Sequence, residues 1–301
     1  MKISELIIEY LLNNGFDTYF LVTGGAIVPM IDSIGSNDKC KYYCFQNEQS
    51  AAMAAEGYYR ASGKCAVVLT TSGPGAQNII NGLCGAYFES IPILFITGQV
   101  SSSESVDNIL SNPRQLGFQE TDIVYIAEKF TKYCKKVNNF DNILNIFKNG
   151  IEQMYYGRYG PILIDIPVDI QMTSTTLQSF PTIVTNFKKS LDISKITQVK
   201  NMINKSKRPL ILAGRGIRLS NSIQLFKKFI NIVNLPIVTT WNATDIIDNN
   251  QNYIGNIGVY GDRGANFAIQ NCDLLLILGS RLDTRQTGGN LKLFSRESKK
   301  L

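Results

Sequence analysis

The fold of this chain is decided by three consecutive segments, QNEQSAAMAAEGYYRASG (46–63), CAVVLTTSGPGAQN (65–78) and PILFITGQV (92–100). Glu48 stands where one predicted strand gives way to a helix. The turn Gly73-Pro74-Gly75 then separates the next buried strand from the next helix. In an open parallel sheet, ligands bind at the C-terminal ends of the strands. Two such ends within one short window predict a binding site here.

Short apolar runs alternate with helical patterns through the first half of the chain. We predict buried strands at 18–22, 41–45, 65–69, 92–97 and 161–166, and helices at 48–62, 75–88 and 139–156. Strands that are apolar on both faces and alternate with helices are typical of a parallel sheet covered on both sides. The first domain, 1–170, is therefore predicted to be a doubly wound α/β domain.

A second α/β domain is predicted after a change of composition. Residues 171–192 are rich in Ser, Thr and Gln and show neither helical nor strand periodicity, which indicates a linker. Strands follow at 208–214, 235–240 and 273–279, with helices at 193–206, 221–233 and 263–271. We expect 193–301 to be Rossmann-like and truncated, because the chain stops soon after its last clear strand.

Composition excludes several classes of function. The net charge of +6 is spread over the chain, and no basic run is interleaved with aromatic residues, so we expect no nucleic-acid binding. The chain has no histidine. That rules out His-based triads and argues against a protein-ligated transition metal, and we assign no metal ligand. The six cysteines lack metal-ligand spacing and are expected to be free thiols.

The N-terminal segment KISELIIEYLLNNG (2–15) does not read as a signal peptide, because Glu5 and Glu9 interrupt its apolar run. It predicts an ordinary helix with Ser4 as its N-cap and Gly15 as its C-terminal stop. No apolar run approaches the length of a membrane span. We therefore expect a cytoplasmic protein without a membrane partner.

Three stretches could carry chemistry, and each has a plain structural alternative. Glu48 at a helix start could serve only to place a negative charge at the positive end of the helix dipole. The small residues around it instead predict a flat cavity beside its carboxyl group. The turn 72–78 lacks the Lys-Ser/Thr of a P-loop and the third glycine of the dinucleotide fingerprint. The turn 214–219 has Leu219 where that third glycine should stand, so alone it reads as a tight strand–helix turn.

The order of these segments resembles a known family. YFLVTGGAIVPMIDSI (19–34), QNEQSAAMAAEGYYRASG, TTSGPGAQNIINGL (70–83), GFQETDI (117–123) and GPILIDIPVDI (160–170) are similar to the pyrimidine-binding domain of thiamine-diphosphate enzymes. RPLILAGRGI (208–217), LPIVTTWNATD (235–245) and FAIQNCDLLLILGSRLDTRQTGG (267–289) are similar to the central domain of the acetolactate-synthase-like branch.

The resemblance implies a role for each matching residue in the first domain. Glu48 matches the glutamate that hydrogen-bonds N1′ of the cofactor's aminopyrimidine and so promotes loss of the thiazolium C2 proton. Pro74 and Asn78 match positions close to the pyrimidine. Gly24 and Gly25 match a glycine loop on the opposing wall, and Phe118-Gln119 match a pair that lines the substrate approach.

The resemblance also implies an FAD site, as in the flavin-binding members of that branch. The matching positions, whose arginine forks suit a diphosphate, are Arg158, Gly214, Gly216, Thr240, Arg281, Asp283 and Arg285.

At three places the sequence departs from the family pattern, and these departures leave the identity of the acceptor substrate open. Asn47 replaces a histidine, Val22-Thr23 replace tyrosine-proline, and Val168 replaces a common lysine. No segment resembles the family's magnesium-diphosphate site, so we expect the Mg²⁺ ligands beyond this chain, on a further domain or a partner, and we expect the chain alone to be inactive.

The resemblance thus implies a carboligase that decarboxylates a 2-keto acid such as pyruvate. It would transfer the two-carbon unit to a 2-keto acid or a keto-sugar, and would work as a homodimer or tetramer. The alternatives are a 2-keto-acid decarboxylase or oxidase, and a non-catalytic flavin- or nucleotide-binding or assembly subunit.

Overall fold

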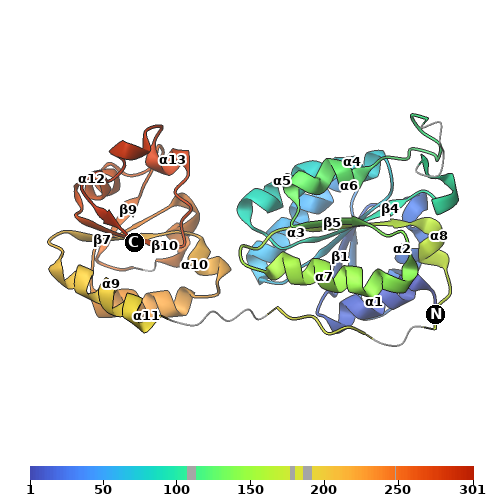
Figure 1. The fold of residues 1–301 in the computed structure, drawn as a ribbon, viewed down its shortest axis with the longest axis horizontal. Helices are drawn as coiled ribbons and strands as arrows, with labels where there is room; N and C mark the ends of the chain where they lie inside the picture. Colours follow the sequence, from blue (N-terminus) through green and yellow to red (C-terminus); the bar gives the residue numbers. More distant parts are fainter. Residues whose placement is uncertain (107–112, 177–179, 186–191, 248) are drawn as a thin grey trace. The chain divides into compact units, whose positions relative to one another are not determined.

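The computed structural model describes residues 1–106, 113–176, 180–185, 192–247 and 249–301 (Figure 1). The chain divides into two compact units, Met1–Lys188 and Lys189–Leu301. Each unit is built on its own parallel sheet, with six strands in the first and five in the second. The prediction of two parallel-sheet α/β domains is confirmed.

The first sheet has the strand order β2-β1-β3-β4-β6-β5, and all neighbouring strands are parallel. Its strands are β1 (Thr18–Leu21), β2 (Lys41–Cys44), β3 (Val67–Thr70), β4 (Leu94–Gln99), β5 (Tyr133–Lys136) and β6 (Ile162–Pro167). Sequence periodicity predicted every strand except β5. The four central strands β1, β3, β4 and β6 are buried along their whole length, which explains their apolar runs.

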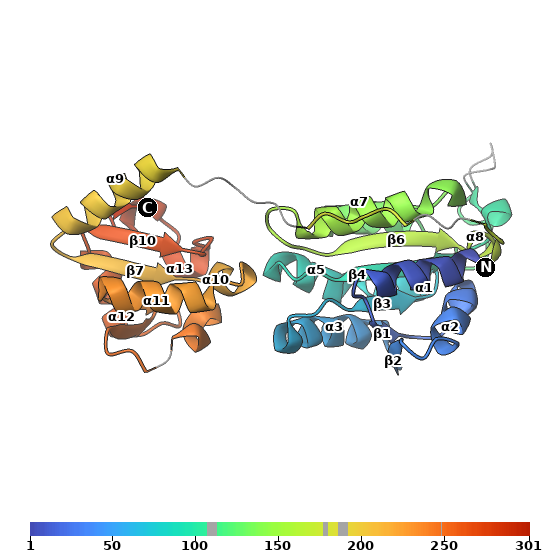
Figure 2. The same cartoon turned by 90° about the horizontal axis from the view of Figure 1, so that it is seen from below.

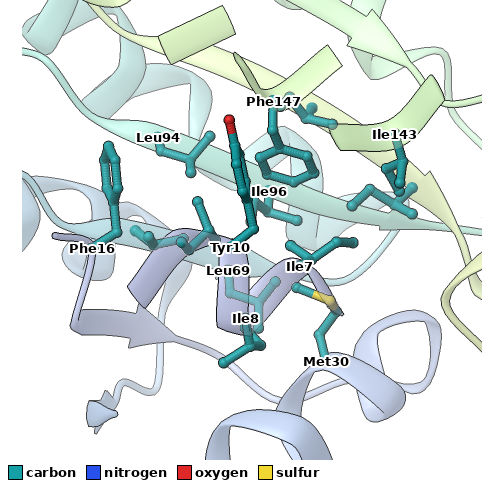
Figure 3. Close-up of a cluster of buried hydrophobic side chains, with 14 of the residues drawn as sticks. Ile7, Ile8, Tyr10, Phe16, Met30, Leu69, Leu94, Ile96, Ile143 and Phe147 are labelled. Atoms are coloured by element: carbon teal, nitrogen blue, oxygen red, sulfur yellow. The ribbon is translucent and has the colours of Figure 1, made fainter. Parts of the chain in front are cut away.

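Helices cover both faces of this sheet (Figure 1). They are α1 (Ile3–Asn13), α2 (Val28–Gly35), α3 (Glu48–Ser62), α4 (Pro74–Asn78), α5 (Ile80–Glu89), α6 (Ile123–Ala127), α7 (Ile143–Tyr155) and α8 (Val168–Met172), with short 3₁₀ turns η1 (Gly25–Ile27), η2 (Ser102–Glu104), η4 (Glu128–Phe130) and η5 (Phe140–Asn142). Helices α1, α2 and α7 pack on one face, where Ile7, Tyr10 and Phe147 meet Leu94 and Ile96 (Figure 3). Helices α3, α5 and α6 pack on the other.

Two sequence predictions in this unit are wrong. The strand at 41–45 was expected to be buried, but β2 lies at the sheet edge and all four of its residues are exposed. Ser4 was expected to cap α1, but the N-cap is Lys2. Ser4 is instead buried inside the helix, where its hydroxyl accepts a hydrogen bond from Ser33 Oγ at 2.9 Å.

The segment after α8 packs back on the first unit. Ser174 forms an antiparallel bridge with Lys2, and the Tyr10 hydroxyl donates to the carbonyl of Pro181 at 3.0 Å. The first part of the predicted linker is therefore held against α1.

The second sheet has the order β11-β10-β7-β8-β9, with β7 and β10 side by side at its centre (Figure 2). Its strands are β7 (Pro209–Ala213), β8 (Ile237–Thr239), β9 (Tyr253–Asn256), β10 (Leu274–Leu278) and β11 (Lys299–Lys300). Its helices are α9 (Ile193–Lys205), α10 (Gly216–Leu219), α11 (Ile223–Val233), α12 (Arg263–Asn271) and α13 (Thr284–Thr287), with 3₁₀ turns η6 (Trp241–Ile246) and η7 (Leu291–Leu293). Helices α9 and α11 pack on one face and α12 on the other. Of the helices in the described ranges, none combines the length and the apolarity that a bilayer crossing needs.

Candidate functional site

Three chain segments meet at the C-terminal edge of the first sheet. Strands β1, β3 and β4 lie side by side and parallel, so the loop after β1 and the turn after β3 emerge at the same edge. Helix α3 begins at this edge as well, directly after β2. This is the position at which open α/β sheets bind ligands.

Glu48 is the first residue of α3, and its side chain is only 9% exposed. The helix starts there because the side chain of Asn47 caps it, accepting a hydrogen bond from the backbone N–H of Ser50 at 3.2 Å. A carboxylate in the first turn is also favoured by the positive end of the helix dipole. Its Oε2 accepts a hydrogen bond from Asn78 Nδ2 at 2.9 Å. Among the described residues, Oε1 accepts no side-chain hydrogen bond, so one carboxylate oxygen is held and the other is available.

Glycines bring backbone close to this carboxylate. A Cβ added at Gly75 would lie 3.2 Å from Glu48 Oε1 and 2.8 Å from Thr71 Cγ2. A Cβ added at Gly24 would lie 2.4 Å from Thr71 Cβ. The side chain of Thr71 therefore fills the space between the loop after β1 and the turn after β3, and it accepts a hydrogen bond from the N–H of Ala26 at 3.3 Å. The backbone of Gly75 therefore lies close to Glu48 Oε1, with Thr71 packed between the two loops.

The segment 117–121 covers the turn after β3. Gln119 has a left-handed backbone (φ 55°), and its carbonyl oxygen would lie 2.5 Å from a Cβ added at Gly73. Gly73 itself has φ 61°, and Pro74 follows as the first residue of α4. The side chain of Phe118 is 81% exposed. Of the predicted residues, Asn78 therefore contacts Glu48 directly. Gly24 lies against Thr71, Gln119 lies against Gly73 beside Pro74, and Gly25 faces open space.

A buried acid that sequence reasoning missed supports this segment. Asp165 on β6 accepts hydrogen bonds from Thr97 Oγ1 at 2.6 Å and from Gln99 Nε2 at 3.0 Å. Gln99 Nε2 also donates to the carbonyl of Thr121 at 2.9 Å. Burial raises the pKa of Asp165 to about 7, although both hydrogen bonds favour its charged form. Its signal in the sequence is the single acidic residue inside the apolar run at 161–166.

In the second unit, Gly214 and Gly216 are explained by close packing between two turns. A Cβ at Gly214 would lie 2.4 Å from the carbonyl oxygen of Gly279, and a Cβ at Gly216 would lie 2.7 Å from its Cα. Gly216 N also donates to that carbonyl at 2.8 Å. The glycines are therefore required by the approach of the β7 turn to the β10 turn, and the space beside them is filled by protein backbone.

The other predicted flavin residues of this unit also lie at the C-terminal edge of its sheet. Thr240 is buried directly after β8, and its N–H donates to Ala213 O at 3.0 Å. Asp283 caps α13 through the N–H of Arg285 at 2.9 Å, and it pairs with the exposed Arg281 at 3.6 Å. Both arginines therefore follow β10 at one place on the edge.

Arg158 belongs to the first unit, where its guanidinium has two local partners. Its Nε donates to Ser90 Oγ at 2.5 Å and its Nη2 donates to Phe88 O at 3.0 Å. These bonds satisfy groups at the end of α5, whose C-cap is Ser90.

No group of three or more His, Cys, Asp or Glu side chains that could hold a metal ion is found within the described ranges.

Two family models match the chain. Residues 1–126 match the N-terminal TPP binding domain of thiamine pyrophosphate enzymes, and residues 196–301 match the central domain of the same enzymes. Thiamine pyrophosphate is another name for thiamine diphosphate. The chain therefore belongs to the thiamine pyrophosphate enzyme family.

Its relatives identify the branch. The acetolactate synthase isozyme 2 large subunit of Escherichia coli is 34% identical over 96% of this chain and 51% of its own length. The mitochondrial acetolactate synthase catalytic subunit of Saccharomyces cerevisiae is 32% identical over 97% of this chain and 43% of its own. The large subunit of Lactococcus lactis acetolactate synthase is 32% identical over 96% and 50%. The branch is acetolactate-synthase-like, and the chain spans about half the length of these relatives.

Proposed function

We propose that this chain provides two domains, 1–170 and 193–301 joined by 171–192, of a thiamine-pyrophosphate-dependent carboligase of the acetolactate-synthase type. The enzyme would decarboxylate a 2-keto acid such as pyruvate and transfer the two-carbon unit to a carbonyl acceptor, which is a second 2-keto acid or a keto-sugar. The observation that carries the proposal is the buried carboxylate of Glu48, with Oε2 held by Asn78 and Oε1 beside the glycine turn.

Glu48 is proposed to be the catalytic residue of this chain. When bound, thiamine pyrophosphate supplies the carbon that attacks the keto acid and stabilises the charge left after decarboxylation. Asn78 holds Oε2, so Oε1 keeps a fixed position from which it can take or give a proton at a nitrogen of a flat ring. Gly75 keeps this position accessible, because a Cβ there would press on Oε1. Pro74 and Gly73 fix the turn that carries Gly75.

The opposing side of the site is proposed to consist of Gly24, Gly25 and Gln119. Gly25 meets no atom within 4 Å of an added Cβ, so its surface can face substrate or cofactor. Gln119 lies against the turn after β3, and Phe118 beside it in the chain is exposed; we propose that these two residues line the approach of the keto acid. Water exclusion at the reacting carbon would depend on these two side chains.

The diphosphate and Mg²⁺ are proposed to bind outside residues 1–301, because no segment of this sequence resembles the family's magnesium-diphosphate site. The family resemblance also supports assembly as a homodimer or tetramer. A cytoplasmic location is part of the same proposal.

FAD is a second proposed cofactor, bound by the second unit. Arg281 and Arg285 can present two guanidinium forks to a diphosphate at the C-terminal edge of the sheet. At the same edge Trp241 stacks on the exposed Tyr260, with ring centroids 5.8 Å apart, and offers an aromatic surface to a planar ring. The glycines Gly214 and Gly216 would act by holding the turn, with Thr240 and Asp283 as supporting residues.

The flavin proposal has a direct test. Purified protein should show flavin absorbance, and Arg281→Ala combined with Arg285→Ala should abolish it. Lys292→Ala, which removes an exposed cation of the same unit, is the matched control and should leave the flavin bound. A wild-type protein that is colourless and fails to take up added FAD would refute this part of the proposal.

The proposed reaction is tested by product analysis. The full-length protein that contains this chain should release carbon dioxide from pyruvate when thiamine pyrophosphate and Mg²⁺ are present. It should convert the two-carbon unit to acetolactate or to a product with an added keto-sugar. Acetaldehyde as the sole product would favour a decarboxylase, and oxygen-dependent acetate would favour an oxidase. No carbon dioxide release would favour a non-catalytic flavin-binding or assembly subunit.

A further inference from the structure

The short helix α8 lies behind the glycine loop of the proposed site. It follows β6 directly and packs against η1, the 3₁₀ turn that continues from Gly24. Its Asp169 accepts hydrogen bonds from the N–H and the hydroxyl of Ser102, at 2.9 and 3.2 Å, and so holds the loop after β4. Its Gln171 reaches the loop after β1. One helix of five residues thus contacts two loops at the C-terminal edge of the sheet.

Gln171 is completely buried, and its amide holds the glycine loop at a defined point. Its Nε2 donates to the carbonyl of Ala26 and to the carbonyl of Ile166, both at 2.8 Å. Both partners can only accept hydrogen bonds, so the nitrogen must face them and the amide orientation is fixed. The side chain therefore ties the glycine loop to the end of β6.

The other amide atom takes no part in these contacts. Gln171 Oε1 is buried and has no hydrogen-bond partner within the described part of the chain. An apolar side chain of the same length would remove this unpaired acceptor, but it would also leave the carbonyl oxygens of Ala26 and Ile166 without their donor. The contribution of this side chain therefore lies in the two hydrogen bonds that it donates, one of them to the glycine loop.

The loop has other anchors as well, and one of them is Ile27, which is fully buried in the core. Ala26 N donates to Thr71 Oγ1 at 3.3 Å, which is a long hydrogen bond. Beneath the loop, a Cβ added at Gly98 would lie 2.2 Å from the carbonyl oxygen of Ala26, so the backbone of β4 supports that carbonyl. Of the side chains that the structure describes, Gln171 is the one that donates to this carbonyl. Loss of its amide should loosen the loop at Ala26.

We propose that Gln171 is a positioning residue that holds the 24–27 loop in the geometry needed at the thiamine site. This inference rests on the proposed function for its catalytic consequence, and on the two hydrogen bonds for its structural one. Gln171 acts through the loop, and its side chain does not itself reach the reacting groups. Loss of the loop geometry should therefore slow the reaction with the keto acid and leave proton transfer at Glu48 unchanged.

The test uses Gln171→Met, which keeps the length of the side chain and removes both donors. Amide hydrogen exchange of peptides covering 22–28 should become about tenfold faster, as expected when roughly 1.4 kcal/mol of local hydrogen bonding is lost. This readout needs no cofactor. In the holoenzyme, kcat/KM for pyruvate should fall about tenfold, while exchange of the C2 proton of thiamine pyrophosphate should stay within twofold of wild type.

A matched control is Tyr10→Phe, which removes another hydrogen bond from a buried side chain to a backbone carbonyl, that of Pro181. It should leave both the amide hydrogen exchange of the loop (called loop exchange below) and kcat/KM unchanged. Gln171→Glu should exceed Gln171→Met in both readouts, because a carboxylate would face two carbonyl oxygens; if it fails to fold, Gln171→Met decides. Loop exchange in Gln171→Met equal to that of wild type would overturn the proposal. An inactive wild-type enzyme with altered loop exchange in the variant would instead refute the proposed function alone.

Discussion

The paired glycines of the 24–27 loop give a matched test of the packing around the site. A Cβ added at Gly24 would lie 2.4 Å from Thr71 Cβ and 2.6 Å from its Cγ2, whereas a Cβ added at Gly25 would meet nothing within 4 Å. Gly24→Ala must therefore push the loop away from the turn after β3, and overpacking of this kind costs about 1–3 kcal/mol. Gly25→Ala should leave stability unchanged or raise it by up to about 1 kcal/mol, because alanine restricts the unfolded chain.

Thermal unfolding followed by circular dichroism measures this difference. Gly24→Ala should lower the melting temperature by roughly 2–12 °C for a unit of this size. Thr71→Ala should not relieve the clash, because the nearest atom is the Cβ itself, whereas Thr71→Gly should recover part of the loss in the double variant. Gly25→Ala should lower kcat/KM for the keto acid at native stability. Equal melting temperatures for Gly24→Ala and Gly25→Ala would refute the packing described here.

Three further predictions concern stability and reactivity. Burial raises the pKa of Asp165 from 3.8 to about 7, so between these pH values the native state binds a proton that the unfolded chain lacks. The free energy of unfolding measured in urea should therefore fall as the pH rises from about 4 to 7, and Asp165→Asn should flatten that dependence. Cys44 is exposed and should react with iodoacetamide in the native protein. Cys65 is buried, which raises its pKa to about 12, so it should be labelled only when the protein unfolds. Equal labelling rates for the two cysteines would contradict this prediction. Gly82→Ala should destabilise the protein by about 1–3 kcal/mol, because its Cβ would lie 2.4 Å from a side-chain carbon of α3. Gly57→Ala should stabilise it by about 0.5–1 kcal/mol, because no atom lies within 4 Å of the added Cβ. If urea unfolding showed Gly82→Ala to be the more stable of the two variants, the packing of α3 on α5 would be contradicted.

The parts of the fold that sequence predicted are those with strong periodicity and clear ends. Helix α3 has the predicted bounds, because Asn47 caps it and Gly63 ends it with φ 72°. The buried strands β3, β4 and β6 follow from their continuous apolar runs. Strand β5 was missed because its sequence, YCKK, lies at the sheet edge, where lysine is tolerated and no apolar run is needed.

Two local misses have physical causes. The helix predicted at 75–88 is divided into α4 and α5 around Ile79, because the turn after β3 must bring Asn78 to Glu48 before the chain can run along the sheet. Strand β11 was missed because its two lysines are exposed and the pairing with β10 supplies its conformation. Neither constraint is local, so neither leaves a pattern in the sequence.

Only some residues of the candidate site could be predicted from the sequence. Glu48, Pro74 and Asn78 could be singled out by resemblance, and their segments meet in the structure. Asp165 and Gln171 could not, because each acts through hydrogen bonds to segments far away in the chain. A lone acid in an apolar run and a glutamine in a short helix carry no spacing that would predict such partners.

The most direct test of the central claim is proton exchange at C2 of thiamine pyrophosphate bound to the full-length enzyme, followed by NMR. In Glu48→Gln the amide oxygen can still accept the hydrogen bond from Asn78, so the fold should persist while exchange slows by roughly 10²–10⁴. Glu56→Gln, on the same helix and paired with Arg60, is the matched control and should exchange like wild type. An exchange rate in Glu48→Gln equal to that of wild type would remove Glu48 from the mechanism and contradict the account.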